Sequence, residues 1–294
     1  SILIQRHKMS KCLITGHKGF IGASLFSQLR RHGHELKGID LKDGVKNDIT
    51  SNLFYSEELL SFKPDYIFHL ACFPRVGFSI DNPVLTMKNN AIGGSLVLDY
   101  ARRVGSVKRV IYSSSSSVIG QGSGPTSPYA LQKLITEMEC KIYSQIYGID
   151  TVSLRYFNVY SEDQKPDGPY ATAICNWMHF LRQGKTPFIT GDGEQRRDMV
   201  HLDDVIRANI FAMNCNINFN GQHLDVGTGR NISLNEIKEI VQKYHDIEFE
   251  YRESRAGEVP LTKADTRLAE KFGFKTCITI EEGLNNCFNF EVNK

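Results

Sequence analysis

Tyr129 and Lys133 form a Tyr-x-x-x-Lys pair near the middle of the chain. If this segment is helical, the two side chains lie on the same face, one turn apart. A phenol with a reference pKa of ~10 is a poor base at neutral pH, but a neighbouring ammonium favours its phenolate. The phenolate could take a proton from an alcohol while hydride leaves the same carbon. The pair thus indicates alcohol oxidation, although surface tyrosines and lysines also occur at this spacing.

Gly16, Gly19 and Gly22 form a second pattern, Gly-x-x-Gly-x-x-Gly, close to the start of the chain. An apolar run ends just before Gly16 and a helical pattern begins after Gly19, so the glycines lie where a strand turns into a helix. A turn of this kind brings backbone N–H groups close to phosphate. The pattern predicts a dinucleotide site, although an ordinary glycine-rich turn has the same composition.

Asp40 separates these two interpretations. It ends the next predicted strand, at about the ~20-residue offset of an acid that hydrogen-bonds an adenosine ribose. Its negative charge would repel a 2′-phosphate, and Asp48 and Ile49 follow the next predicted strand. We therefore predict NAD, rather than NADP, as the partner of Tyr129 and Lys133.

The elements that must position these residues are those of an α/β fold. Short apolar runs alternate with helical stretches up to about Arg155, which is typical of a parallel sheet covered by helices on both faces. Ser127 and Pro128 are a capping residue and a helix-starting proline, so Tyr129 should lie in a first helical turn. The expected strands are Cys12 to Thr15, Glu35 to Ile39, a weak one near Val45, Tyr66 to Leu70, Arg109 to Tyr112 and Thr151 to Leu154. The expected helices follow Gly19, Pro83 and Pro128.

The predicted fold class is a Rossmann-type, doubly wound parallel sheet with a smaller C-terminal substrate lobe. Residues 1–8 would be an extension, 9–165 the NAD-binding domain and 166–294 the lobe, with about 196–230 returning to the first domain. Proline and glycine cluster at Lys165 to Pro169 and at Gly191 to Gly193, which marks loops that carry this lobe.

Composition excludes several other classes. The chain has 294 residues, 41% of them hydrophobic, and a net charge of +2 with both signs interspersed, so we expect no nucleic-acid or membrane partner. No apolar run approaches the ~20 residues of a membrane helix. The seven cysteines lack Cys-x-x-Cys spacing, which favours a cytoplasmic protein without disulfides. His32 and His34, and His201 with Asp203 and Asp204, are interpreted as helix ends, and no metal is expected.

Together these motifs resemble the extended short-chain dehydrogenase/reductases of the NAD-dependent nucleotide-sugar epimerase/dehydratase family. The resemblance covers nearly everything from Met9 onward. Besides the two patterns above, it rests on His69-Leu-Ala71, Asn90-Ala-Ile-Gly93, Tyr112 to Gly120, Leu154 to Tyr160, Gly191 to Asp198, Val200 to Asp204, Arg255-Ala-Gly-Glu258 and Ala264-Asp265.

The resemblance implies roles for individual residues. Ser115 corresponds to the hydroxyl that positions the substrate alcohol beside Tyr129 and Lys133. The implied NAD-binding residues are Gly16, Gly19, Phe20, Ile21, Gly22, Asp40, Asp48, Ile49, Leu70, Ala71, Asn90, Ser113, Tyr129, Lys133 and Tyr156. The implied substrate-binding residues are Ser115, Asn158, Phe188, Thr190, Arg197, Arg255, Glu258 and Thr262.

Among the implied substrate residues, Asn158, Arg197 and Arg255 would grip the diphosphate of a UDP- or dTDP-sugar. Guanidinium groups suit that task because their donors match phosphate oxygens. Glu258 would hold the ribose, and the backbone of Pro187 to Thr190 would read the pyrimidine.

The resemblance also narrows the reaction. Dehydratases of this family carry Asp-Glu immediately after the catalytic hydroxyl, whereas this chain has Ser116 and Ser117, which favours a 4-epimerase. Thr262 stands where a bulky tyrosine restricts similar enzymes to plain hexoses, so UDP-GlcNAc/UDP-GalNAc is the first choice, with UDP-Glc/UDP-Gal still accepted. A 4,6-dehydratase, a 4-keto reductase and a non-catalytic NAD sensor or scaffold remain alternatives. Ile119, Ser161 and a short loop from Gly120 to Pro128 depart from the family pattern and leave the sugar most open.

Two predicted helices, Val84 to Val104 and Pro128 to Tyr147, have apolar faces. In similar enzymes such helices pair with those of a second subunit in a four-helix bundle, so we expect a homodimer. Burial against the chain's own sheet would explain the same faces.

Overall fold

The computed structural model describes residues 9–120, 122–166, 172–253 and 261–289. The chain divides into two compact units. The first contains the chain up to Ser114 together with Ser127–Leu154 and Asn209–His223. The second contains Ser115–Thr126, Arg155–Ala208 and the chain from Leu224 onward. Each unit therefore draws on separate stretches of sequence, and the chain passes between them several times.

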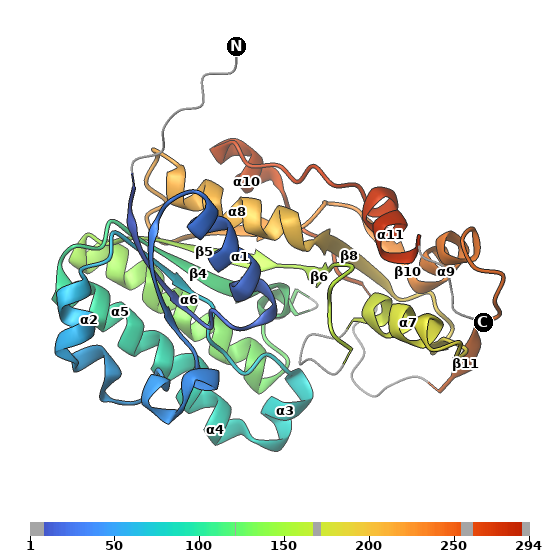
Figure 1. Ribbon diagram of the computed structural model, residues 1–294, viewed down its shortest axis with the longest axis horizontal. Helices are drawn as coiled ribbons and strands as arrows, with labels where there is room; N and C mark the ends of the chain where they lie inside the picture. Colours follow the sequence, from blue (N-terminus) through green and yellow to red (C-terminus); the bar gives the residue numbers. More distant parts are fainter. Residues whose placement is uncertain (1–8, 121, 167–171, 254–260, 290–294) are drawn as a thin grey trace, which may run out of the picture. The chain divides into compact units, whose positions relative to one another are not determined.

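The first unit is built on a six-stranded sheet with the order β2-β1-β3-β4-β5-β9 (Figure 1). Its strands are β1 (Lys11–Thr15), β2 (Glu35–Ile39), β3 (Tyr66–His69), β4 (Arg109–Ser115), β5 (Asp150–Tyr156) and β9 (Gln222–Val226). β1 pairs in parallel with β2 and β3, and β3 pairs in parallel with β4. The predicted α/β, Rossmann-type fold is confirmed, because the central strands are apolar runs that the helices bury.

The helices of the first unit follow the strands in alternation. They are α1 (Phe20–Arg31), α2 (Glu57–Phe62), α3 (Val76–Asp81), α4 (Pro83–Met87), a π-helix (Lys88–Ile92), α5 (Gly93–Val104) and α6 (Pro128–Tyr147), while α8 (Leu202–Asn214) runs from the second unit into the first. Val97 and Leu98 of α5 pack with Ile67, Val110 and other sheet residues in one core. The chain thereby buries α5 against β3 and β4.

Two sequence predictions of local structure were wrong in detail. No strand forms near Val45; Leu41–Asp43 and Val45–Asn47 are short 3₁₀ turns. Val45 is 83% exposed, since its polar neighbours offer no second apolar residue to bury against a sheet. The helix predicted from Val84 begins at Pro83 and is interrupted by the π-helix before α5.

Among its described residues, the second unit contains two small sheets and four further helices. The sheets have the orders β10-β8-β6 and β11-β7. Their strands are β6 (Asn158–Tyr160), β7 (Phe188–Thr190), β8 (Arg196–His201), β10 (Asn231–Ser233) and β11 (Glu250–Arg252). The helices are α7 (Ala173–Arg182), α9 (Leu234–Gln242), α10 (Arg267–Phe272) and α11 (Ile280–Phe288).

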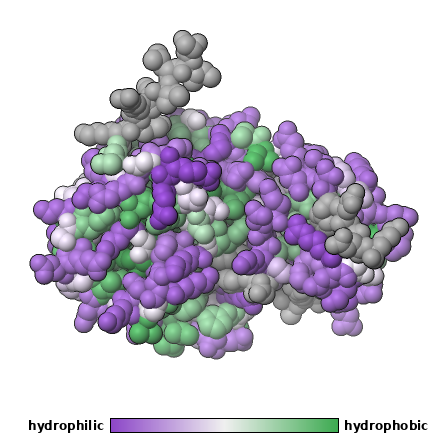
Figure 2. Space-filling view, viewed as in Figure 1, coloured by the Kyte–Doolittle hydropathy of each residue, from purple (hydrophilic) through white to green (hydrophobic). Residues whose placement is uncertain are grey.

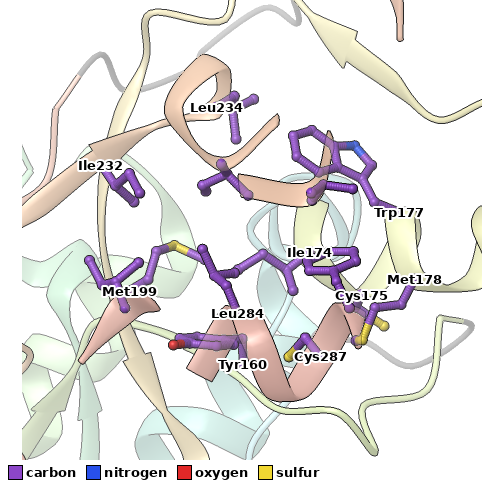
Figure 3. Packing of buried hydrophobic residues seen from close by; sticks show 14 of the residues in the cluster. Tyr160, Ile174, Cys175, Trp177, Met178, Met199, Ile232, Leu234, Leu284 and Cys287 are labelled. Atoms are coloured by element: carbon purple, nitrogen blue, oxygen red, sulfur yellow. The ribbon is translucent and has the colours of Figure 1, made fainter. Parts of the chain in front are cut away.

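An apolar core packs the described helices and strands of the second unit together (Figure 3). Trp177 and Met178 of α7 contribute to it and pack with residues of α9, α11 and β8. Close packing leaves no room for a larger residue at Gly283, where a Cβ would lie 2.0 Å from the hydroxyl of Tyr160. In the part of the chain that the structure describes, no helix has the length and apolar character needed to cross a membrane.

Candidate active site

The predicted cofactor residues of the first unit meet at one edge of its sheet. Thr15 is paired with Ile39 of β2 and with His69 of β3, and His69 is paired with Tyr112 of β4. Gly16, Asp40 and Leu70 follow these positions and leave the sheet side by side at its carboxyl edge, whereas β4 continues through Ser113 to Ser115. In open α/β sheets this edge is where ligands bind.

The glycines of the turn are required by close contacts. Gly16 has φ +74°, and a Cβ there would lie 2.8 Å from the amide nitrogen of Ala71. A Cβ on Gly22 would lie 2.0 Å from the carbonyl oxygen of Gly16. Gly19 is the N-cap of α1 and provides no side-chain cap. A side chain at Gly16 or Gly22 would therefore collide with the backbone of the turn or of the loop after β3.

This turn fits the diphosphate of a dinucleotide. The first turn of α1, which begins with Phe20 and Ile21, contains no acidic side chain. Because helix N-terminal N–H groups carry partial positive charge, such an end attracts phosphate unless a carboxylate already occupies it. The predicted NAD site therefore has the backbone shape and the charge that it needs.

Asp40 is held rigidly beside the turn. Its carboxylate accepts hydrogen bonds from the backbone N–H groups of Lys18 and Lys42, both at 2.9 Å. Asp48 similarly accepts the N–H and hydroxyl of Thr50 at 2.8 Å. These contacts orient both carboxylates before any ligand binds.

Two predicted cofactor residues have buried side chains that contact other parts of the protein. Ile49 is 3% exposed and belongs to the core, so only its backbone can face a ligand. Asn90 is 1% exposed; its Oδ1 accepts the N–H of Phe73 at 2.7 Å, and its Nδ2 donates to the carbonyl of Phe73 and to Gln132. Asn90 thus anchors the loop after β3.

α6 begins where the sequence predicts it. Pro128 is the first residue of the helix, and the Ser127 hydroxyl accepts the N–H of Ala130 at 3.2 Å. Ser79 carries no signal in the sequence; its buried hydroxyl accepts the N–H of Tyr129 at 3.0 Å. Two hydroxyls therefore fix the helical turn that carries Tyr129.

Lys133 is held close to Tyr129. Its Nζ donates to the carbonyl oxygen of Ser113 at 2.7 Å and lies 5.9 Å from the centroid of the Tyr129 ring. Lys133 is only 2% exposed, and Tyr129 is 9% exposed. A cation near a phenol favours its ionised form, which is the physical basis of the role predicted for this pair.

His69 is a further buried group that sequence reasoning did not single out for chemistry. Its Nδ1 and the hydroxyl of Thr15 are 2.7 Å apart, and that hydroxyl accepts the N–H of Ala71 at 3.2 Å. Burial, and secondarily the charge of Lys133, lower the pKa of His69 to about 3. The His69 imidazole is therefore neutral, and through Thr15 it helps to hold the backbone of Ala71 next to Gly16.

Ser115 and Tyr156, two other predicted site residues, fall in the second unit. The hydroxyl of Ser115 accepts hydrogen bonds from the backbone N–H of Ser117 at 3.2 Å and from the Ser117 hydroxyl at 2.9 Å. Ser115 is the last residue of β4, two positions after the carbonyl that Lys133 contacts. Tyr156 ends β5 and is 8% exposed.

A cavity of about 360 Å³ in the second unit brings four predicted substrate residues together. These are Asn158, Phe188, Thr190 and Arg197. Asn176 and Gln195 also line the cavity and were not predicted, because isolated amide residues carry no sequence signal. The mixture of apolar walls and polar groups suits a nucleotide.

The contacts of Asn158 and Phe188 limit what they can offer this cavity. The Asn158 amide donates to the carbonyl of Asp198 at 2.9 Å and to the hydroxyl of Thr262 at 3.2 Å, so binding a diphosphate would require it to exchange one of these bonds. The carbonyl oxygen of Phe188 already accepts the indole N–H of Trp177 at 2.8 Å.

Thr262 lines a second cavity, of about 330 Å³, with Ile119, Phe157, Leu261 and others. Its hydroxyl contacts Asn158, which lines the first cavity, so the two cavities of this unit adjoin through these side chains. Arg255 and Glu258 lie outside the described residues.

Asp198 ties the segment around Thr262 to β8. Its buried carboxylate accepts the N–H groups of Thr228, Gly229 and Ala264 at 2.8 to 3.0 Å. Burial raises the pKa of Asp198, although these bonds oppose the shift. Within the described part of the chain, no group of three or more His, Cys, Asp or Glu side chains is arranged to hold a metal ion.

Comparison with known proteins identifies the class to which this fold and site belong. The sequence model of the NAD dependent epimerase/dehydratase family matches residues 12–227. The chain belongs to this family, which confirms the resemblance seen in its motifs and the prediction of NAD as cofactor.

Particular relatives span nearly the whole chain. The putative UDP-glucose 4-epimerase of Methanocaldococcus jannaschii is 32% identical, covering 96% of this chain and 98% of its own length. The UDP-glucose 4-epimerase of Thermotoga maritima, solved with UDP-glucose, has a TM-score of 0.86 at 30% identity and covers 95% and 97% of the two chains. The UDP-N-acetylglucosamine 4-epimerase of Methanobrevibacter ruminantium, solved with UDP-N-acetylmuramic acid, has a TM-score of 0.84 at 29% identity, covering 96% and 97%.

Proposed function

We propose that the protein is an NAD-dependent 4-epimerase of UDP-sugars. The observation that carries the proposal is the buried ammonium of Lys133, held by the Ser113 carbonyl 5.9 Å from the ring of Tyr129. An enzyme of this family needs a base beside its nicotinamide, and this is the arrangement that makes a phenol basic.

The residues of the chain would divide the work as follows. Tyr129 takes the proton from the 4-hydroxyl of the sugar and later returns it, and Lys133 stabilises the phenolate between the two steps. Ser115 orients the 4-hydroxyl. Bound NAD would supply the hydride acceptor. The 4-keto sugar rotates in the site, and the hydride then returns to the opposite face of carbon 4. The cofactor is therefore regenerated in each catalytic cycle.

Epimerisation is favoured over dehydration by the residues after Ser115. Removing water from the sugar needs an additional acid and base, but Ser116 and Ser117 are hydroxyls, and Ser117 donates to Ser115. Without carboxylates at these positions, oxidation and re-reduction at carbon 4 is the reaction that the site supports.

For the sugar, we propose UDP-GlcNAc and UDP-GalNAc as the first pair, with UDP-Glc and UDP-Gal also accepted. Thr262 lines a cavity of about 330 Å³ together with Phe157 and Leu261, and we propose that an acetamido group occupies it. Arg197 in the adjoining cavity would bind the diphosphate. Solved family members carry a UDP-sugar, which supports this nucleotide.

The test is to incubate the protein with a panel of UDP- and dTDP-sugars and to separate the products. We expect interconversion of 4-epimers without net consumption of NAD(H), fastest for the N-acetylated pair. Release of a 4-keto-6-deoxy sugar would indicate a dehydratase, and consumption of added NADH or NADPH would indicate a reductase.

Tyr129→Phe tests the catalytic assignment. The substitution removes the hydroxyl but keeps the ring, so we expect kcat to fall by about 10²- to 10⁴-fold while bound NAD is retained. Tyr143→Phe is the matched control, because Tyr143 lies on the same helix and should leave kcat near that of the wild type. Near-normal turnover in Tyr129→Phe would refute the assignment.

A further inference from the structure

Three basic residues belong to the two turns next to Asp40 at the carboxyl edge of the first unit's sheet. His17 and Lys18 belong to the glycine turn, and Lys42 belongs to the 3₁₀ turn that follows β2. Lys18 and Lys42 both give their backbone N–H to the Asp40 carboxylate. The region that would receive an adenosine ribose thus contains the cations that a 2′-phosphate would need as well as the carboxylate that excludes it.

Asp43 engages two of these basic side chains. Its Oδ1 forms an ion pair with the Nζ of Lys18, and its Oδ2 lies 3.5 Å from Nε2 of His17. The 3₁₀ turn makes this contact, because the N–H of Asp43 donates to the carbonyl of Asp40 at 2.9 Å and folds the chain back over the glycine turn. Lys42 is held in turn by the carbonyl of Lys18 at 3.2 Å.

We propose that Asp43 is a second determinant of the preference for NAD over NADP, acting by sequestering the ammonium of Lys18. Asp40 repels a 2′-phosphate directly. Asp43 withholds the cation that would otherwise neutralise that phosphate. The chain therefore carries a cation suited to NADP, kept inactive by one ion pair at the surface.

The geometry gives this ion pair freedom to break. The Lys18 side chain is 44% exposed and that of Asp43 is 30% exposed, so neither is locked by packing. Lys18 lies between Gly16 and Gly19 in the turn, and its backbone N–H is already bonded to Asp40. Once released, its ammonium could swing toward the ribose without any change in the fold.

The experiment is a displacement assay on the full chain loaded with radiolabelled NAD⁺. Unlabelled NAD⁺ and NADP⁺ are titrated separately, and the ratio of their half-displacing concentrations measures preference without any turnover. We expect Asp43→Asn to shift this ratio about fivefold toward NADP⁺, which corresponds to about 1 kcal/mol, the upper range for one exposed ion pair. Displacement by NAD⁺ itself should change little.

A second substitution separates the mechanism from simple removal of negative charge. In Asp43→Asn combined with Lys18→Ala, the ratio should return to the wild-type value, because the released cation is gone. Glu58→Gln is the matched control: it also removes a carboxylate that pairs with a lysine, Lys37 of β2, and should leave the ratio unchanged. An unchanged ratio in Asp43→Asn, or a gain that persists without Lys18, would overturn the proposal. Because only cofactor binding is measured, the result does not depend on the identity of the sugar.

Discussion

Single buried polar side chains position the loops around the glycine turn. The side chains of Thr15 and His69 are hydrogen-bonded to each other next to the contact between Gly16 and Ala71. The Asn90 amide accepts the N–H of Phe73 and donates to its carbonyl oxygen. None of these side chains needs to touch a ligand to matter. Thr15 and Asn90 satisfy backbone groups of the loop that would otherwise destabilise it, and His69 holds the Thr15 hydroxyl in place.

His69 makes stability depend on pH in a defined window. Its folded-state pKa of about 3 lies below the ordinary value of 6.5, so between these values the unfolded chain binds a proton that the folded chain does not. The free energy of unfolding should therefore fall as pH drops below 6.5, by about 2 kcal/mol at pH ~5 from this residue alone.

Urea unfolding of the wild type and of His69→Asn at about pH 7 and pH 5 measures this component. The variant should be less stable at neutral pH, because it loses the ring that stacks on Tyr112, but should lose less stability on acidification. His179→Asn, at a partly exposed histidine of α7, should retain the wild-type dependence. Identical slopes for the wild type and His69→Asn would contradict the prediction.

Among the secondary-structure elements, α6 and β4 are the pair on which the candidate site depends. α6 carries Tyr129 and Lys133, and β4 carries the carbonyl of Ser113 that Lys133 contacts. A second link lies one turn further along, where the hydroxyl of Ser114 donates to the carboxylate of Glu137. Both residues are buried, at 3% and 6% exposure, so the link is shielded from water.

Glu137→Ala should therefore destabilise the fold by about 1–3 kcal/mol, the cost of leaving the buried Ser114 hydroxyl without its acceptor. Glu137→Gln keeps an acceptor oxygen and should cost less. Gln145→Ala, at an exposed position of the same helix, should change stability by no more than about 0.5 kcal/mol. Denaturant titration gives all three values, and equal stability of Glu137→Ala and Gln145→Ala would show that the link is dispensable.

On the molecule as a whole, exposed apolar residues concentrate on a few helices of the first unit. Figure 2 shows hydrophobic residues along the lower edge, over α3 and α4, and Val84 and Leu85 of α4 are 82% and 48% exposed. Met138, Ile142 and Ile146 of α6 are also exposed and lie at helical spacing on one face. The predicted homodimer, formed through the helical segments Val84 to Val104 and Pro128 to Tyr147, would cover such a stripe, and this assembly stays a prediction.

The substitution Met138→Glu tests the predicted homodimer. Met138 is 59% exposed, so the substitution should leave the folded chain intact while placing a charge in the expected interface. Sedimentation should then change from dimer to monomer. Val45→Glu, at an 83% exposed residue of a loop, is the control and should remain dimeric. A wild-type chain that sediments as a monomer would refute the expectation directly.

Much of the fold could be read from sequence because its signals are local. The glycine spacing, the apolar strand runs and Ser127-Pro128 each act within a few residues, and the strands and the start of α6 are found where these signals lie. The strand predicted near Val45 was wrong because it rested on a single apolar residue, and the sequence alone does not show whether that residue is buried. The π-helix at Lys88–Ile92 likewise has no local signal.

Residue type and spacing alone indicate the class of chemistry, because a glycine turn, an acid after the second strand and a Tyr-x-x-x-Lys pair are all visible in the sequence. The tertiary structure decided which side chains are still available for that chemistry. It engages the amide of Asn158 with Asp198 and Thr262, buries Ile49 in the core and pairs Lys18 with Asp43. Such partners are distant in the chain, and only folding brings them within hydrogen-bonding range.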